Sequence, residues 1–420
     1  MADRNTIVAV DLGSSEIKAL VCGFDDDTGK TTVRGYHKGE SLYIDKNGRI
    51  TDVNSLALSL STVIHEACNI AGVSSSCVVC GLPVTDINQY HSTGPISIPS
   101  DRGVPGQVTR EHIHQAIETA QNIRYPGDHE IIDILVEDYI IDNAKRVQNP
   151  LDMPASRLDV NLLICSAPSS SVMVTRKCIE KAGFFCEDIF LNPIASGTVA
   201  VSRYAREKGC VHIDMGASLT TFSVYQNGSV IYMGSVPAGG KLVTSDLLVA
   251  YMVPSSYNTL NAVDMLKKRY NKLRIDKPDE EIVLQGASGM AEAALTREQF
   301  VTVMVDRLYE IFDEVAKDIE KNGLLDEVDE VILSGGTARF AGITELCRRR
   351  FGKPVSVATP WITGDDMMAE INVPEFVTAY GLANYYYLGD ERSKIFRSYE
   401  NGGGRIRGMI QGIFGKFKRG

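Results

Sequence analysis

The sequence predicts an α/β protein made of two similar lobes, because one strand–turn–strand pattern occurs twice. The first copy spans residues 7–24 and places a turn of small residues between two apolar strands rich in β-branched residues. The second copy spans residues 212–224 and repeats the order of strand, Asp-X-Gly turn and strand. A third apolar strand, at 331–333, runs into a Gly-Gly turn and then a helical stretch at 343–351. The duplication predicts two halves of similar design that face one site.

Each of the two repeated turns combines a carboxylate with small residues, a composition suited to phosphate and Mg²⁺. Asp11 ends the first strand, and Asp214 ends the corresponding strand of the second copy. Small side chains let backbone N–H groups approach an anion, and hydroxyl groups add donors. We expect a nucleotide between the halves, with both aspartates holding Mg²⁺ through water. The residues expected to bind it at these turns are Asp11, Gly13, Ser14, Ser15, Lys18, Asp214, Gly216, Ala217 and Ser218.

Two further glycine pairs are expected on the nucleoside side of this site. Gly239 and Gly240 precede a predicted helix at 243–251, and a Gly-Gly turn opening a helix can lie against purine and ribose. Lys241 is a candidate contact, although a plain loop-to-helix junction explains it equally well. The third strand supplies the remaining candidates, Gly335, Gly336 and Thr337.

Composition excludes several classes of protein. The chain has 420 residues, more than one ordinary core accommodates, with 44% hydrophobic and 23% charged residues. It contains no apolar run long enough to span a membrane and no signal-peptide pattern, so we expect a cytosolic protein. Nine cysteines, mostly within apolar runs, indicate buried reduced thiols, and Cys77 and Cys80 sit in a strand-like run without a second pair at zinc spacing.

Charge is unevenly distributed along the chain. The net charge is −10, but residues 405–420 hold five of the 43 basic residues and no acidic one. The other 38 basic residues stand against all 53 acidic residues, a net charge of −15. An acidic body does not suggest nucleic acid as a partner, whereas a basic tail suggests an anionic surface.

The C-terminal tail is predicted to be an amphipathic helix on a flexible tether. Residues 389–404 read as a linker that ends in three glycines. In 405–420, apolar residues recur at offsets of three and four along one face, with basic residues largely off it. A docked helix would not need a tether, so we favour a membrane anchor over a helix docked on the protein itself. The residues expected at the membrane are Arg405, Ile406, Arg407, Met409, Ile410, Ile413, Phe414, Lys416, Phe417, Lys418 and Arg419.

Two internal segments interrupt the duplicated pattern. Residues 84–163 carry their own Pro- and Gly-rich loops, a helix capped by Thr109, and strands near 131–141 and 160–165, which predicts a small inserted α+β subdomain. Residues 255–290 are polar and are expected to be irregular, within a second small subdomain. Thr296 then opens a capping box and a long helix that Gly323 ends.

The order of these motifs resembles the actin and sugar-kinase ATPase superfamily, with 192–197 and 379–383 similar to its two connecting segments. With the inserted subdomain and the tail, the chain resembles the FtsA family of bacterial cell-division proteins. That resemblance implies an actin-like two-lobed fold, binding of ATP and Mg²⁺, and assembly into a polymer. It also implies a tether that holds the tubulin-like FtsZ ring on the cytoplasmic face of the membrane at the septum. FtsZ would bind through its C-terminal tail, and other division proteins are further expected partners.

The resemblance also suggests boundaries. The core of the first lobe would take 1–83, 164–196 and about 376–388, with the insertion at 84–163. The second lobe would take 197–240 and 296–375, with the smaller, FtsZ-binding subdomain at 241–295. The linker at 389–404 and the membrane helix at 405–420 complete the chain.

Two departures from the family pattern bear on activity. Ala217 stands where many relatives have glycine, which is expected to weaken phosphate binding. Asn192 stands where chaperone ATPases of the superfamily have a carboxylate, and a neutral amide cannot accept a proton from water, so we expect at most slow ATP hydrolysis. The alternatives are a sugar or acetate kinase, which needs a catalytic carboxylate in the cleft, and a pilus-assembly ATPase, which normally lacks such a tail.

Overall fold

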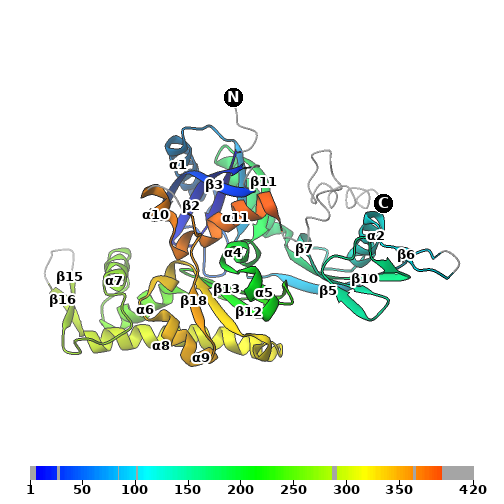
Figure 1. Cartoon of the computed structure of the whole chain (residues 1–420). Helices are drawn as coiled ribbons and strands as arrows, with labels where there is room; N and C mark the ends of the chain where they lie inside the picture. Colours follow the sequence, from blue (N-terminus) through cyan, green and yellow to red (C-terminus); the bar gives the residue numbers. More distant parts are fainter. Residues whose placement is uncertain are drawn as a thin grey trace. The chain divides into compact units, whose positions relative to one another are not determined.

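The computed structural model describes residues 6–25, 29–83, 85–100, 103–285, 291–362 and 366–389. These residues divide into two compact units (Figure 1). The first unit holds residues up to Asp86 together with Ser169–Asn384. The second holds the described residues of Ile87–Pro168 together with residues 385–389.

One lobe of the first unit is a five-stranded mixed sheet. Its strands are β1 (Thr6–Leu12), β2 (Glu16–Asp25), β3 (Lys30–Glu40), β4 (Cys77–Leu82) and β11 (Phe185–Leu191), in the order β11-β4-β1-β2-β3. The first three strands are antiparallel neighbours, and β4 and β11 run parallel to β1. Helices α1 (Val53–Ala71) and α3 (Ser169–Lys181) pack on this sheet and on each other. Because β1 is buried along its whole length, its apolar run predicted it well.

The other lobe repeats this sheet, which confirms the predicted duplication. Its strands are β12 (Cys210–Met215), β13 (Thr220–Gln226), β14 (Ser229–Val236), β17 (Glu330–Ser334) and β18 (Val355–Val357), in the order β14-β13-β12-β17-β18. Again three antiparallel strands are extended by two parallel ones. Helices α6 (Gly240–Ala250), α8 (Arg297–Lys321) and α9 (Ile343–Phe351) share one buried apolar core with the sheet.

Two helices coincide with the predicted connecting segments. They are α4 (Asn192–Ala200) and α11 (Val377–Leu388). A side chain at Gly381 would lie 2.3 Å from the carbonyl oxygen of Ala195, so these helices touch backbone to backbone there. The short elements α5 (Arg203–Lys208), α10 (Asp366–Ile371), η1 (Leu325–Glu327), η2 (Gly336–Arg339) and η3 (Pro374–Phe376) complete the connections.

The segment predicted to be irregular is mostly regular, so that prediction is wrong. Helix α7 (Tyr257–Arg269) occupies it, followed by the hairpin β15 (Glu281–Gln285) and β16 (Ala291–Thr296). Ser256 caps α7 in a capping box with Thr259, and Val263 is fully buried. The helix has only a thin apolar stripe, which explains why its polar sequence concealed it. By contrast, the predicted capping box at Thr296 is confirmed, and Gly323 lies at the end of α8 with φ +70°.

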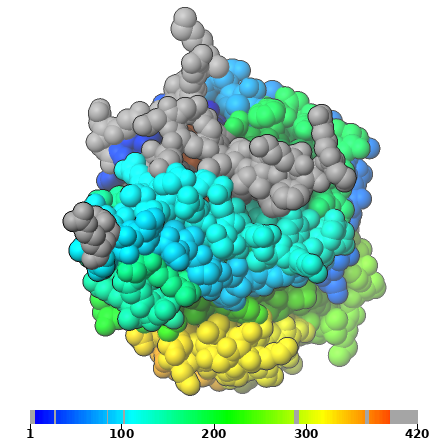
Figure 2. Space-filling view, turned by 90° about the vertical axis from the view of Figure 1, so that its right-hand side faces the viewer, coloured from blue at the N-terminus to red at the C-terminus, as the bar shows by residue number. Residues whose placement is uncertain are grey.

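The second unit is built on the sheet β5-β10-β7-β8. The strands are β5 (Asn88–Ser97), β10 (Arg157–Pro168), β7 (His129–Ile141) and β8 (Lys145–Val147), and a separate short pair joins β6 (Gly106–Gln107) to β9 (Pro154–Ala155). Helix α2 (Arg110–Gln121) covers one face of the sheet and is capped by Thr109 as predicted. β5 was not anticipated, because Gly94 and Pro95 within it read as a loop. Figure 2 shows part of this unit's surface, in cyan to blue-green.

The predicted membrane helix and all of the predicted linker except Gly389 lie outside the described residues. Within the described part of the chain, no helix has the length and apolar character needed to cross a membrane. The nine cysteines form no disulfide, and eight of them are buried. Cys77 and Cys80 both lie in β4, as the strand-like pattern around them predicted.

Candidate functional site

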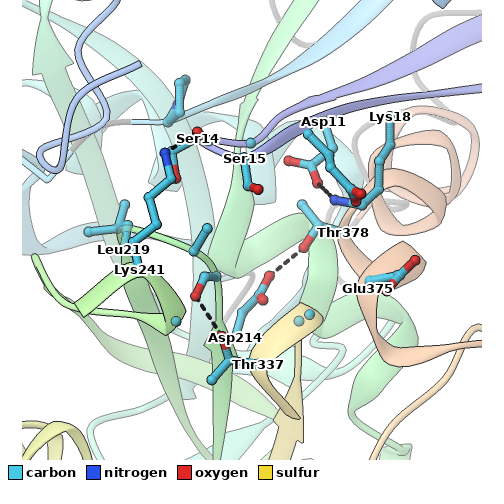
Figure 3. A pocket seen from close by; sticks show the side chains of 18 of the residues that line it. Asp11, Ser14, Ser15, Lys18, Asp214, Leu219, Lys241, Thr337, Glu375 and Thr378 are labelled. Atoms are coloured by element: carbon cyan, nitrogen blue, oxygen red, sulfur yellow. Dashed lines mark hydrogen bonds and ion pairs between the residues drawn. The ribbon is translucent and has the colours of Figure 1, made fainter. Parts of the chain in front are cut away.

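A cavity of about 430 Å³ lies between the two lobes of the first unit. Its walls include the turn between β1 and β2, the turn between β12 and β13, the start of α6, one side of α7 and the segment that follows β17. Figure 3 shows the polar side chains that these segments direct into it.

At the first turn, a carboxylate and an ammonium group are buried side by side. Asp11 pairs with Lys18 across the β1–β2 ladder, and Lys18 Nζ lies 3.4 Å from Asp11 Oδ2. Burial alone would lower the pKa of Lys18, but the nearby carboxylates of Asp11, Glu16 and Glu375 together raise it. The site therefore holds a buried positive charge that is partly neutralised by one aspartate.

At the second turn, Asp214 accepts a hydrogen bond from the hydroxyl of Thr378, at the start of α11 (Figure 3). Burial raises the pKa of Asp214 to about 6, and the negative charge of Asp11 acts in the same direction. Two carboxylates on facing turns of one cavity are suited to a cation or to cation-bound water.

The three glycine segments predicted from the sequence meet around the second turn. Gly216 O accepts hydrogen bonds from Gly240 N (3.1 Å) and from Thr337 Oγ1 (2.8 Å). A side chain at Gly335 would lie 2.3 Å from Asp214 Oδ1, and the residue has φ +87°, so only glycine fits there without strain. Separate parts of the chain thus present bare backbone at one place in the cavity.

The two turns also contact each other directly across the cavity. Ser218 N donates to Ser14 Oγ at 3.1 Å. Lys241 Nζ, from the start of α6, donates to Ser14 O at 2.6 Å (Figure 3). Both donors are of the type that binds phosphate oxygens. Ser14 therefore accepts hydrogen bonds from two groups that could otherwise donate to an anionic ligand.

The structure brings nearly all of the predicted residues to this cavity. Ser218 is buried with its N–H on Ser14, and Gly239 packs against Gly216 and Ala217 without lining the cavity. Their role in nucleotide binding stays a prediction. The predicted residues that line the cavity are Asp11, Gly13, Ser14, Ser15, Lys18, Asp214, Gly216, Ala217, Gly240, Lys241, Gly335, Gly336 and Thr337.

Sequence reasoning missed a charged face of α7 that forms one wall. Three charged residues of α7 line the cavity, namely Asp264, Lys267 and Lys268. Asn271, just beyond the end of the helix, continues the same spacing and lines the cavity too. Lys267 is 7% exposed, and its Nζ donates to Gly240 O and to Thr244 Oγ1, each at 2.7 Å. This i, i+3, i+4, i+7 spacing was the available signal, and it was overlooked because the segment was assigned as irregular.

Other missed residues line the cavity without any local sequence signal. Thr378 and Glu375 come from the segment before and at the start of α11. Arg339 and Lys38 pair with Glu375. These four side chains lie far apart along the chain, and only the folded sheets bring them together.

Two sheets of the same strand order, with carboxylate-bearing turns around a shared cavity, define an actin-like ATPase fold. Solved structures agree. The chain is similar to a PilM–PilN type IV pilus biogenesis complex at 16% identity and a TM-score of 0.61, covering 90% of this chain and 97% of that one. It is also similar to MreB 5 of Spiroplasma citri bound to AMPPNP at 12% identity and a TM-score of 0.53, covering 95% and 99%.

Sequence comparison identifies the family. Residues 85–166 match the SHS2 domain inserted in FtsA, and 211–381 match the family model of cell division protein FtsA. Cell division protein FtsA of Neisseria meningitidis serogroup B is 30% identical over 380 residues, which is 90% of this chain and 89% of the relative. That of Bacillus subtilis is 24% identical over 389 residues, covering 92% and 84%. The chain belongs to the FtsA family of cell division proteins.

Proposed function

We propose that this FtsA-family chain binds ATP with Mg²⁺ in the cavity between its lobes. The observation that carries the proposal is the meeting of three glycine segments around two carboxylates and several cationic side chains. Bare backbone admits phosphate and ribose, and the cations compensate the phosphate charge. A neighbour in fold, MreB 5 of Spiroplasma citri, was solved with AMPPNP and with ADP, which supports a nucleotide as the ligand class.

The carboxylates suit Mg²⁺ held mainly by water and phosphate. Among the described residues there is no group of three or more His, Cys, Asp or Glu placed to hold a metal ion. Mg²⁺ commonly keeps several waters and takes only one or two protein carboxylates beside substrate phosphates. Asp11 and Asp214 would fill that role, and the cation would stabilise Asp214 in its ionised form.

Donors for the phosphates come from both turns. The N–H of Ser218 and the ammonium group of Lys241, which now donate to Ser14, would donate to phosphate oxygens instead. The ammonium group of Lys18 would move from Asp11 toward the same phosphates. The nucleoside would lie against Gly240, α7 and Gly336. ATP would thereby draw on groups of both lobes and act as a ligand that sets their closure.

Hydrolysis is expected to be slow. Asn192 lines the cavity at the first connecting segment, and its amide cannot accept a proton from an attacking water. We expect turnover far below the enzyme median of about 10 s⁻¹.

At the cellular level, we propose that the protein assembles into a polymer and tethers FtsZ to the cytoplasmic face of the membrane at the septum. Support comes from family membership and from the sequence of the tail at 405–420. Anionic lipids would bind the tail, and the C-terminal tail of FtsZ would bind the subdomain at 241–295. Cross-linking a labelled peptide of the FtsZ C-terminus tests the second point, because labelling confined to other segments contradicts it.

Titration calorimetry with Mg²⁺·ATP tests the nucleotide site. Asp11→Ala should weaken binding at least tenfold, because the buried ammonium group and the cation both lose a partner. Asp86→Ala is the matched control, since that carboxylate pairs with Arg49 on the surface of the same unit and does not line the cavity. Equal affinity in wild type and Asp11→Ala would show that the nucleotide binds elsewhere.

A further inference from the structure

Asn192 stands at the edge of the first sheet where three parallel strands end. Strands β1, β4 and β11 are neighbours, with Cys80 paired to Val10 on one side and to Ile189 on the other. Asn192 follows β11 directly, so it lies two strand spacings, roughly 10 Å, from the strand that carries Asp11. The cavity residues on the glycine segments and α7 belong to the other lobe. Asn192 therefore lies on the wall away from the predicted nucleoside contacts.

The side-chain oxygen of Asn192 is buried and unsatisfied. Its Oδ1 has no hydrogen-bond partner among the described residues. Asn192 engages in a hydrogen bond through its backbone oxygen, which accepts from Ser196 Oγ at 2.8 Å. Since buried carbonyl groups are nearly always paired, an unpaired one needs a reason.

Gly81 explains where this oxygen lies. A Cβ built on Gly81 would be only 1.9 Å from Asn192 Oδ1 and 3.0 Å from its Cγ. The oxygen thus fills the space next to β4 that any other residue at position 81 would occupy. Because the side-chain oxygen lies against Gly81, the amide nitrogen Nδ2 is the polar side-chain atom that Asn192 can direct into the cavity.

We infer that Asn192 donates a hydrogen bond from Nδ2 to the terminal phosphate of a bound nucleoside triphosphate. An N–H group donates to phosphate oxygen but cannot accept the proton of a water molecule. The residue therefore distinguishes triphosphate from diphosphate and does not position a water for attack. This role rests on the proposed nucleotide binding and adds to it which ligand state the site favours.

Calorimetric titration of the full chain with Mg²⁺·AMPPNP and Mg²⁺·ADP tests the inference. Asn192→Ala should weaken AMPPNP binding about tenfold and leave ADP binding within twofold, because only the triphosphate reaches the lost donor. Asn192→Asp should weaken AMPPNP more than Asn192→Ala does, because a carboxylate repels phosphate.

Gly81→Ala is a second, independent variant that leaves Asn192 in the chain. The new methyl group should displace the amide and produce the same selective loss for AMPPNP, and ADP binding reports that the variant is folded. If Asn192→Ala leaves the ratio of AMPPNP affinity to ADP affinity unchanged, the inference is wrong. If single-turnover ATP hydrolysis also becomes slower in that variant, Asn192 instead positions the attacking water. If wild type binds neither nucleotide, the proposed function itself fails.

Discussion

Lys38 Nζ lies 2.9 Å from Glu375 Oε1, and this ion pair joins β3 of the first lobe to the η3 segment that leads back from the second. The other oxygen of Glu375 accepts from Arg339 Nη1 at 2.8 Å. Burial would raise the pKa of Glu375, but hydrogen bonds from these two cations lower it. All three side chains line the cavity, so the pair closes one side of it.

Glu375→Gln is expected to speed nucleotide release. The variant removes the negative charge that both cations contact. Because the side chains of Lys38 and Arg339 are 40% and 52% exposed, the lost interaction free energy should be about 1 kcal/mol. The rate of nucleotide release should therefore rise a few-fold. Stopped-flow release of a fluorescent ADP measures it. Glu345→Gln, which breaks an exposed pair within α9, is the control, and equal release rates in both variants would contradict the proposed closing role.

Asp214→Asn is expected to stabilise the nucleotide-free protein at neutral pH. The folded-state pKa of Asp214, about 6, lies above its ordinary value of 3.8. Its contribution to stability is therefore complete below pH 3.8 and is lost as the pH rises through about 6. The neutral amide avoids this loss, so the gain should be about 3 kcal/mol at pH 7.5 and should shrink toward pH 5. Urea denaturation at both pH values measures it, and a gain that does not depend on pH would refute the assignment.

Lys267→Met is expected to destabilise the second lobe. Burial would raise the pKa of Asp264, but Lys267 and, to a smaller extent, Lys268 lower it to about 2. The ammonium group of Lys267 also donates hydrogen bonds to Gly240 O and Thr244 Oγ1. Losing one partner of a buried ion pair should cost about 3 kcal/mol. Lys268→Met, whose side chain is 65% exposed and pairs with the same Asp264, should cost less than about 1 kcal/mol. Similar urea midpoints for both variants would show that Lys267 is not structurally important.

Deleting 405–420 is expected to release the protein from anionic liposomes while nucleotide binding persists. Apolar burial and five positive charges should act together in the intact tail. At 1 M salt, where screening acts over about 3 Å, flotation with liposomes should weaken but persist, whereas Phe414→Glu should nearly abolish it. If the truncated protein still floats, the anchor lies elsewhere in the chain.

The duplicated hairpins and their turns could be predicted because each buried strand is a short apolar run that is followed directly by its Asp-X-Gly turn. Asp11 and Asp214 are each the next-to-last residue of a strand with a buried apolar run, so a short window of sequence identifies them. Helix α7 was missed because its buried stripe is thin and its charged residues serve the cavity. The hydrogen bond from Thr378 to Asp214 joins residues that are 164 positions apart. It forms only after α11 has packed beside the second sheet, so no local sequence pattern predicts it.

The central claim is that Mg²⁺·ATP binds between the two carboxylate-bearing turns. A crystal structure of the full chain grown with Mg²⁺·AMPPNP tests it most directly. We predict density for the phosphates between the turns that carry Ser14 and Ser218, with Mg²⁺ near Asp11 and Asp214. We also predict the nucleoside against Gly240 and Gly336. Nucleotide density at another place on the molecule, or an unchanged Ser14–Ser218 contact with no nucleotide beside it, would contradict the account.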